Sequence, residues 1–433
     1  MKMDWNGKPY YDHPPMGFWL MAVSYKIFGI NEFSTRFPSA ILGVFSILLI
    51  FKIGEALSGK KLVGLSAALV LGTAVWFVIR VRSGNLDSPF VFFYLLTIFL
   101  SLKSQKNFKW FPMVGLAFGG LILTKTLVGA SAIFLILFLN FKQFFNIKKN
   151  ILLMILGIVA FLGIVFPWYR IQLTTYSDFY QHHFVNIGTR NKTLASYLNP
   201  MYEQPLFFIH MGVRKWYYLW LASLAFLIIS FKFLKRNVFL ILLWNFIILY
   251  PFLTSKETEL WHLIPVYLPI ALITSVGLYE GILFVTSLSG YLVKTRRFPT
   301  PLRLVQNDKI RNSLYLLFFL YISFVQIKIF FKEVYPANKW IPDDVAISRA
   351  AAKYGKPIFL DDDYLPIAVF YSGKRIYPLM YQPDEKKTLV KFFQSDEMNF
   401  VVITRNWAVA DLDKKDLTYK LLEKNSSFSI LTR

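Results

Sequence analysis

Three short polar segments of this 433-residue chain contain the residue types best suited to chemistry. They are WNGKPYYDHPP, IRVRSGNLDSP and LTKTLVGA, which carry Asp12, His13, Arg80, Arg82, Asp87 and Lys125. A carboxylate can deprotonate a hydroxyl group or bind a divalent cation. Arginine and lysine bind phosphate through charge-assisted hydrogen bonds. Together these residue types predict a site for a polar substrate that carries phosphate.

Each of these segments also has a purely structural interpretation. Asp87 lies at the expected start of a helix, where it could be an N-cap instead of a ligand for a cation or a sugar hydroxyl. Arg80, Arg82 and Lys125 could place their charged ends in water at a membrane surface while their stems stay apolar. WNGKPYYDHPP could be a turn only.

Further polar residues lie in later segments. His262, in ELWHLIPVYLP, is expected either to contact an anionic substrate or to be a hydrogen-bonded interfacial histidine. His182 and His183 are adjacent, so they would not share a helix face as two zinc ligands at i and i+4 do, and metal binding is not expected there. Arg190 and Lys192 could assist in binding an anionic head group.

The composition is that of an integral membrane protein. Hydrophobic residues make up 55% of the chain, and the mean hydropathy is +0.46, which is too apolar for a soluble domain of this length. The chain has no cysteine, which excludes disulfides, thiol catalysis and cysteine-ligated metals.

Apolar runs alternate with charged loops along most of the chain. The runs lie at 36–56, 62–80, 86–103, 110–124, 126–141, 151–168, 214–231, 237–253, 261–284 and 312–331. Most are close to the roughly 20 residues that a helix needs to cross the hydrocarbon layer. We therefore predict a mainly α, polytopic membrane helix bundle of about ten spanning helices.

The net charge of +23 follows the same alternation. Basic residues gather in alternate loops, such as the one containing Lys60 and Lys61 and the one containing Lys148 and Lys149, which the positive-inside rule places in the cytoplasm. The basicity is thus explained by membrane topology, and a nucleic-acid partner is not expected. The opposite loops, with the three polar segments and both chain ends, face outward.

The N-terminal region is expected to form an outer loop over residues 1–35. Phe18, Trp19, Val23 and Ile27 have helical spacing, which is typical of an amphipathic helix in the membrane interface. No signal peptide precedes this outward segment, so we expect an upstream transmembrane helix to be missing from the chain. The membrane domain is then expected over 36–331.

The C-terminal part, residues 336–433, has a soluble composition. PIFLDDD, KRIYPL, FVVITR and FSILTR are typical of strands, and residues 343–354 and 384–396 of helices. Asp361, Asp362 and Asp363 are expected to form a turn and not a calcium site. A small α/β domain on the outer face is predicted.

Several motifs resemble one family, the GT-C class of polyprenyl-phosphate-dependent glycosyltransferases, which includes protein mannosyltransferases and the lipid A aminoarabinose transferase. The resemblance covers roughly residues 4–285, in order. It rests on WNGKPYYDHPPMGFWLMAVSYKIFGINEFSTRFPSA, IRVRSGNLDSPFVFF, LTKTLVGA, FPWY and ELWHLIPVYLPIALI. These are similar to the family's first outer loop, its R…LD.P..FF segment, its LTKGPVG turn and its later PWY and YLLPLYP segments.

The resemblance implies roles for individual residues. Asp12 and His13 stand where the family often has Glu-Lys, so His13 replaces the lysine that contacts the lipid phosphate. Asp87 matches the second acidic position, Arg36 the arginine before PSA, and Lys125 the lysine of the TK turn. Thr126 replaces the usual glycine of that turn. The family's principal acidic pair lies upstream of this motif, so it is missing from the chain.

The implied reaction moves a sugar from an undecaprenyl- or dolichyl-phosphate donor to an extracytoplasmic acceptor: a lipid, a glycan or a protein. Asp12 and Asp87 are the expected catalytic carboxylates. The phosphate and lipid donor are expected to contact His13, Arg36, Arg80, Arg82, Lys125 and His262. The cofactor is unknown, with a divalent metal as one candidate and Asp87 as its ligand. The expected location is the cell membrane, with the C-terminal domain outside; the alternative is a non-catalytic membrane protein, either a pseudoenzyme or a lipid-carrier transporter.

Overall fold

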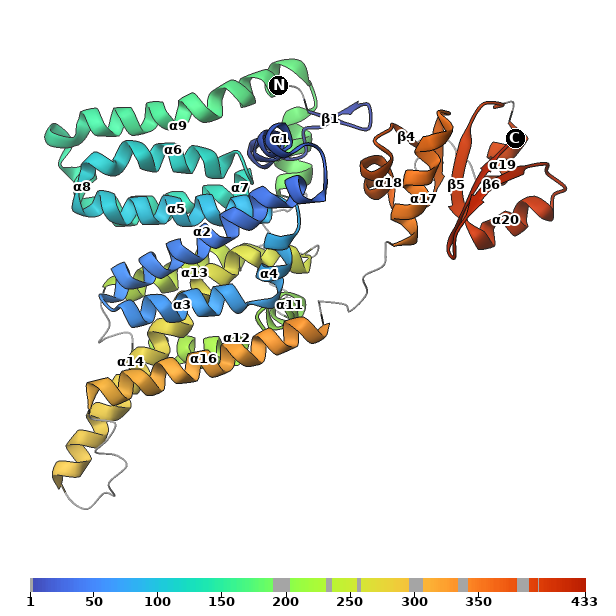
Figure 1. Ribbon diagram of the computed structural model, residues 1–433. Coiled ribbons are helices and arrows are strands. Elements are labelled where there is room, and N and C mark those ends of the chain that lie inside the picture. Colours follow the sequence, from blue (N-terminus) through green and yellow to red (C-terminus); the bar gives the residue numbers. More distant parts are fainter. Residues whose placement is uncertain are drawn as a thin grey trace. The chain divides into compact units, whose positions relative to one another are not determined.

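A computed structural model describes most of the chain, and its described part divides into two compact units (Figure 1). The described residues are 3–189, 203–230, 236–254, 258–295, 307–333, 342–379, 389–395 and 397–433, described without their side chains at 187–189, 286–295 and 333. Arg190 and Lys192 lie outside these residues. Tyr11–Pro336 form the helical unit, and Met1–Tyr10 with Ala337–Arg433 form the α/β unit. The segment expected as one loop over 1–35 is thus divided between the two.

The helical unit is built from helices that follow one another closely along the chain. Its elements are α1 (Met16–Phe28), α2 (Glu32–Ser58), α3 (Lys61–Thr73), α4 (Val75–Arg82), α5 (Asp87–Lys106), η1 (Phe108–Trp110), α6 (Phe111–Ile122), α7 (Thr126–Ala130), α8 (Ala132–Phe145), α9 (Ile147–Thr175), the π-helical η2 (Gln181–Thr189), α11 (Glu203–Val213), α12 (Trp216–Ile229), α13 (Arg236–Leu253), η4 (Leu260–Val266), α14 (Tyr267–Thr295) and α16 (Asp308–Glu333).

Seven of the described helical segments are long and apolar enough to cross a membrane, compared with the expected number of about ten. The predicted run 62–80 is instead a bent pair, α3 and α4, with an angle of 67° between its two parts. If that pair counts as one span, the number rises to eight. The runs 110–124 and 214–231 form shorter apolar helices, Phe108–Ile122 and Trp216–Ile229. The mainly helical membrane architecture is confirmed, and the difference lies in these shorter and broken segments.

A buried glutamine holds the bend in α3 and α4 together. The side chain of Gln326, from α16, is fully buried and donates hydrogen bonds to the carbonyl oxygens of Thr73 at 3.3 Å and Val213 at 2.8 Å. Its own oxygen accepts a bond from the backbone N–H of Lys215 at 3.2 Å. These backbone groups lie at the breaks between α3 and α4 and between α11 and α12, where helical partners are missing. One side chain therefore satisfies polar groups at two helix breaks.

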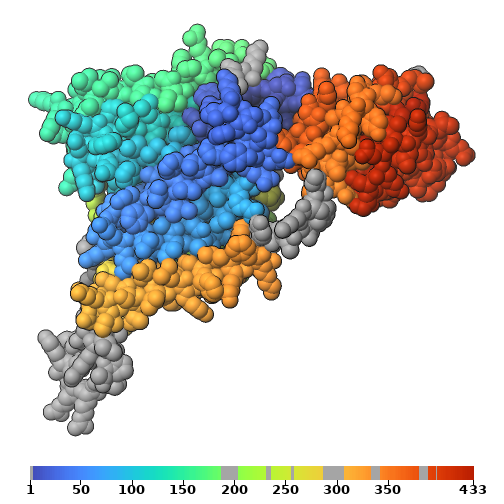
Figure 2. All heavy atoms as spheres, in the orientation of Figure 1, coloured from blue at the N-terminus to red at the C-terminus, as the bar shows by residue number. Residues whose placement is uncertain are grey.

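The outer surface of the helical unit is apolar, as the spanning helices require. In Figure 2, one face of this unit is formed by α2, α3 and α16. Val44 and Leu48 of α2 are exposed, as are Leu317 and Phe324 of α16. On α1, Val23 and Ile27 are also exposed, which agrees with the amphipathic helix expected there.

The α/β unit contains a five-stranded mixed sheet in the order β4-β3-β5-β7-β6. Its elements are α17 (Asp343–Ala351), η5 (Ala352–Tyr354), β3 (Ile358–Asp361), α18 (Leu365–Ser372), β4 (Ile376–Pro378), α19 (Leu389–Gln394), β5 (Val401–Arg405), α20 (Asn406–Asp413), β6 (Lys420–Lys424) and β7 (Phe428–Thr432). The four predicted strands are present, and β6 was not predicted. The predicted helix 343–354 corresponds to α17 and η5, and part of the predicted helix 384–396 corresponds to α19.

The consecutive aspartates of this unit follow β3. Asp361 accepts a hydrogen bond from Thr404 at 2.8 Å, and Asp362 pairs with Arg405. Both partners lie at the end of the neighbouring parallel strand β5. The segment therefore joins two strand ends, in agreement with the expected turn.

A short hairpin at the N-terminus completes the α/β unit. Strands β1 (Asp4–Trp5) and β2 (Lys8–Pro9) pair in antiparallel fashion. Asn6 and Gly7 form the turn between them, with φ values of 52° and 82°. Asn-Gly favours such a turn because both residues tolerate positive φ.

Candidate active site

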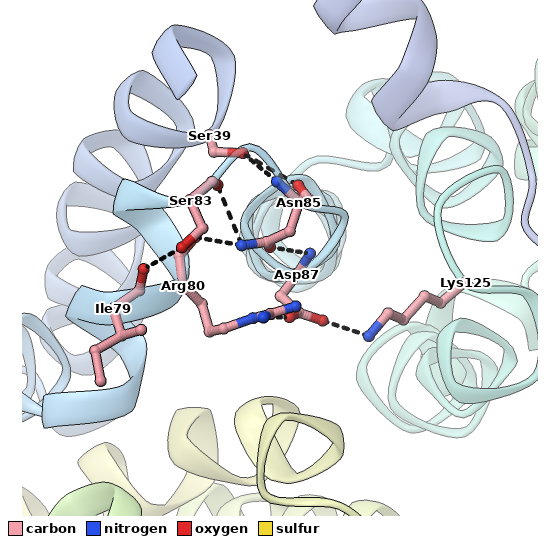
Figure 3. Close-up of polar contacts among 7 residues, drawn as sticks. All are labelled: Ser39, Ile79, Arg80, Ser83, Asn85, Asp87 and Lys125. Carbon is pink, nitrogen blue, oxygen red and sulfur yellow. Dashed lines mark hydrogen bonds and ion pairs between the residues drawn. The ribbon is translucent and has the colours of Figure 1, made fainter. Parts of the chain in front are cut away.

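A buried carboxylate with two cationic partners forms the first part of the site (Figure 3). Asp87, at the first position of α5, is only 3% exposed. Arg80, at the end of α4, donates from Nε to Asp87 Oδ2 at 2.5 Å, and Lys125, before α7, donates from Nζ to Asp87 Oδ1. Figure 3 shows the two cations approaching the carboxylate from opposite sides. The structure thus brings Arg80, Asp87 and Lys125 into direct contact, while their role in catalysis or phosphate binding stays a prediction.

The turn before α5 fixes the position of Asp87. The side-chain oxygen of Asn85 accepts a bond from the Asp87 backbone N–H at 2.8 Å, and its amide donates to the Arg80 carbonyl at 2.7 Å. Ser39, on α2, donates to the Asn85 carbonyl at 3.1 Å. The N-cap interpretation of Asp87 is therefore wrong. Asn85 serves the N-terminal N–H of α5, and the Asp87 carboxylate is directed to the cations.

A more accessible carboxylate forms the second part of the site. Asp12 Oδ1 lies 2.7 Å from His182 Nε2, and the two side chains are 41% and 32% exposed. The preceding Tyr11 donates its hydroxyl to Asp178 at 2.7 Å and stacks on Tyr176 with ring centroids 4.6 Å apart. These contacts hold the 11–13 loop against the segment that contains His182.

Thr126 joins the two parts. Its hydroxyl is 3.0 Å from His183 Nε2, while His183 Nδ1 is 3.2 Å from the Tyr11 carbonyl. Thr126 directly follows Lys125 in the chain. In addition, the Met16 N–H donates to the Leu123 carbonyl at 2.9 Å. The 11–16 segment and the 123–126 turn are therefore packed together, which brings Asp12 and Lys125 into the same region of the helical unit.

The electrostatic environment affects His13 in particular. Burial lowers the pKa of His13 below its ordinary value of 6.5, and the positive charge of Lys125 lowers it further, whereas Asp12 and Asp87 oppose the shift. The imidazole is therefore neutral at pH 7, so it would meet a phosphate as a hydrogen-bonding group and not as a cation. Burial also lowers the pKa of His183. The bond to Asp178 raises the pKa of Tyr11 to about 12, which keeps its hydroxyl protonated.

Three of the predicted phosphate ligands have other surroundings. Arg82 lies over the ring of Phe330 in α16, 5.5 Å from its centroid. Arg36 is exposed on α2. His262 accepts a bond at Nδ1 from the Glu259 N–H at 3.0 Å, as part of a capping box at η4. Their contact with a donor phosphate stays a prediction.

The sequence did not predict site contacts between residues that are far apart in the chain. His182 is 170 positions from its partner Asp12, and no local pattern connects the two. His182 and His183 do contact different groups, as expected for adjacent residues. Asn85 could have been recognised, because asparagine often accepts from the N–H two residues later. Its bond to Asp87 has this spacing.

Comparison with known proteins matches the part of the chain that contains Asp12, Asp87 and Lys125. The family described as dolichyl-phosphate-mannose-protein mannosyltransferase matches residues 12–169. An undecaprenyl phosphate-alpha-4-amino-4-deoxy-L-arabinose arabinosyl transferase of Pseudomonas fluorescens is 30% identical over 122 residues, 27% of this chain and 22% of its own length. A polyprenol-phosphate-mannose–protein mannosyltransferase of Mycobacterium tuberculosis is 39% identical over 82 residues, 19% of this chain and 16% of its own length. These matches show that part of the chain is similar to polyprenyl-phosphate-dependent glycosyltransferases of the GT-C class, and the aligned part is less than a quarter of the length of either relative.

The fold of the chain is similar to that of a solved structure. ArnT of Cupriavidus metallidurans, bound to undecaprenyl phosphate, superposes with a TM-score of 0.70 at 15% identity, over 99% of this chain and 89% of ArnT. The likeness at this identity concerns the fold alone. With the apolar helices, it establishes a multi-pass membrane protein.

The arrangement limits what each carboxylate of the site can do. Both Asp87 oxygens contact cations, which weakens their attraction for a divalent metal and for a proton. Asp87 therefore fits poorly as a metal ligand or general base in this arrangement. Asp12 has one oxygen on His182 and is partly exposed, so it can reach a substrate hydroxyl. Carboxylate and imidazole are both groups that bind divalent cations, and among the described residues no cluster of three or more such groups is found.

Proposed function

We propose that this chain transfers a sugar from a polyprenyl-phosphate donor, undecaprenyl or dolichyl phosphate, to an extracytoplasmic lipid, glycan or protein acceptor. The observation that carries the proposal is the convergence of Arg80 and Lys125 on the buried Asp87, in the region that also contains the accessible Asp12. Two cations held by one carboxylate carry a net positive charge, which favours binding of a phosphate group.

The proposed step breaks the bond between the anomeric carbon and the phosphate oxygen of the donor. The electron pair of that bond stays on the phosphate, where Arg80 and Lys125 stabilise the developing charge. The acceptor oxygen bonds to the anomeric carbon and gives its proton to Asp12, which acts as general base. His182 orients the Asp12 carboxylate. Asp87 holds the cations in place and does not take the proton.

The proposed location is the cell membrane, with the site and the α/β unit on the extracytoplasmic side. The alternation of basic loops in the sequence supports this orientation. The lipid-linked sugar donor would reach the site from within the membrane. The exposed apolar side chains of α1 and α2 support this route.

Binding of polyprenyl phosphate to the purified chain tests the phosphate site. Arg80→Gln and Lys125→Met each remove a charged hydrogen-bond donor and should weaken binding by about tenfold to a hundredfold. Lys52→Met is a matched control, because Lys52 is 54% exposed and pairs with Glu55 three residues along the same helix. Equal binding by all variants would contradict the assignment. Binding of polyprenyl phosphate without any sugar transfer by the same protein would favour the non-catalytic alternative, a pseudoenzyme or lipid-carrier transporter.

A further inference from the structure

Three side chains form a hydrogen-bonded row from α9 to the loop that precedes α1. The Tyr169 hydroxyl, on α9, lies 2.5 Å from Thr126 Oγ1, and Thr126 Oγ1 lies 3.0 Å from His183 Nε2. On the other side of the imidazole ring, His183 Nδ1 lies 3.2 Å from the Tyr11 carbonyl oxygen. All four residues belong to the helical unit. We call Tyr169, Thr126 and His183 the hydroxyl–imidazole row.

The chemistry of these groups decides the direction of each hydrogen bond. A carbonyl oxygen only accepts, so His183 Nδ1 carries a proton and donates it to the Tyr11 carbonyl. Burial lowers the pKa of His183 below its ordinary value of 6.5, so the ring is neutral at neutral pH and Nε2 is an acceptor. The single hydroxyl proton of Thr126 is then donated to Nε2, and the Thr126 oxygen accepts from the Tyr169 hydroxyl. The row therefore requires a hydroxyl group at position 126.

Aromatic neighbours hold the His183 ring in this orientation. The ring is buried and stacks on Phe179, with centroids 4.9 Å apart and 15° between the planes. Trp168 and Tyr169 lie edge-on to it, with centroid distances of 5.9 Å and 6.0 Å. A ring packed in this way cannot rotate to exchange its two nitrogens unless its neighbours move. The Nδ1 donor therefore stays directed at the Tyr11 carbonyl.

The row ends at the peptide bond that begins Asp12. The carbonyl of Tyr11 and the N–H of Asp12 belong to one planar peptide group, so the bond from His183 orients the backbone at Asp12 directly. The preceding histidine, His182, lies 2.7 Å from Asp12 Oδ1. Two consecutive histidines thus hold Asp12 at two points, one at its backbone and one at its carboxylate.

We infer that Thr126 and His183 are positioning residues for the Asp12 carboxylate, and that Tyr169 completes the row that orients them. The catalytic consequence rests on the proposed function, in which Asp12 meets the acceptor hydroxyl at hydrogen-bond distance and in a fixed orientation. Glycine is the usual residue at position 126 in the family that this turn resembles. Glycine has no hydroxyl, so a chain with the usual turn cannot form the hydroxyl–imidazole row.

Nitrogen NMR of isotope-labelled histidine rings in the purified protein tests the row without requiring activity. The His183 signals are identified by their loss in His183→Gln. In the wild type at neutral pH, the His183 proton should be on Nδ1, and Nε2 should have the chemical shift of a hydrogen-bonded acceptor. A wild-type proton on Nε2 would overturn the row, because Nδ1 could then not donate to the Tyr11 carbonyl.

Thr126→Val keeps the shape of the side chain and removes the hydroxyl. It should shift the His183 Nε2 signal toward that of a nitrogen without a hydrogen bond. The His182 ring signals should change as well, because movement of the loop alters the bond between His182 and Asp12. Thr126→Ser should keep the wild-type signals. Thr174→Val is the matched control, because Thr174 is exposed on α9. Unchanged His182 signals in Thr126→Val would overturn the positioning of Asp12.

Kinetics then separate positioning from folding and from phosphate binding. Thr126→Val should lower kcat by about tenfold, the effect of one lost hydrogen bond, with little change in donor KM or in binding of polyprenyl phosphate. Thr126→Ser should recover most of kcat, and Thr174→Val should match the wild type. Wild-type kcat in Thr126→Val, no recovery in Thr126→Ser, or a parallel loss of lipid binding would overturn the positioning role. Absence of transfer in the wild type would refute the proposed function, whereas the NMR signals of His182 and His183 would still decide whether the row positions Asp12.

Discussion

The clearest test of the buried ion cluster is Asp87→Asn. The substitution keeps the shape of the side chain and removes the charge that holds Arg80 and Lys125. Removal of one partner from a buried ion pair costs about 3–5 kcal/mol. We expect the lower value, about 3 kcal/mol, because Arg80 and Lys125 remain 25% and 20% exposed to water.

The assay is unfolding of the purified protein in detergent, with and without polyprenyl phosphate. Without ligand, Asp87→Asn should be destabilised by about 3 kcal/mol. A ligand at 100 times its dissociation constant stabilises the folded protein by about 2.7 kcal/mol. Its phosphate supplies the charge that the variant has lost, so it should stabilise Asp87→Asn more than the wild type and recover most of the loss.

The control is Asp308→Asn. Asp308 pairs with Arg311 at 2.7 Å but is 78% exposed, so its loss should change stability by less than about 1 kcal/mol. If Asp87→Asn lowers the free energy of unfolding no more than this control does, the buried cluster does not stabilise the fold. If the lipid phosphate stabilises Asp87→Asn no more than the wild type, the phosphate does not bind at the two cations.

Three further perturbations follow from the same geometry. Asp12→Asn should reduce transfer by about a hundredfold or more through loss of the general base while polyprenyl-phosphate binding is retained; a parallel loss of binding would contradict its role as base. The stability of the wild type should fall relative to that of His13→Gln as the pH decreases from about 7 to 5. The reason is that the pKa of His13 is lowered in the folded state, so the unfolded chain binds the proton more readily. The same dependence of melting temperature on pH in both proteins would refute this. Gln326→Met should destabilise the chain by about 3 kcal/mol, since buried backbone groups lose their partners, whereas the exposed Gln181→Met should have little effect in the same denaturation assay.

The sequence was informative where local composition decides the outcome. The apolar runs predicted the helical membrane architecture, and the short runs FVVITR and FSILTR predicted strands that correspond to β5 and β7. The polar segments that flank those runs contain Arg80, Asp87 and Lys125, which were predicted as site residues and which the structure brings together. Their common position follows from helix ends that meet at one side of a bundle.

The missed features depend on tertiary contacts. Arg80 and Arg82 were grouped, yet residues two positions apart on a helix point in different directions, and Arg82 lies over Phe330 instead. The pairing of Asp12 with His182 joins residues 170 positions apart in the chain. The charge of His13 depends on its burial and on Lys125, neither of which a single sequence shows.

The central claim is best tested by transfer itself. The purified protein should be incorporated into lipid vesicles and supplied with a polyprenyl-phosphate-linked sugar, labelled in the sugar, together with cell-envelope acceptors. The account predicts that the label moves to an acceptor, with one polyprenyl phosphate released per sugar, and that Lys125→Met slows this transfer while Lys52→Met does not. Label that stays on an intact donor, or transfer that is unaffected by Lys125→Met, would contradict the account.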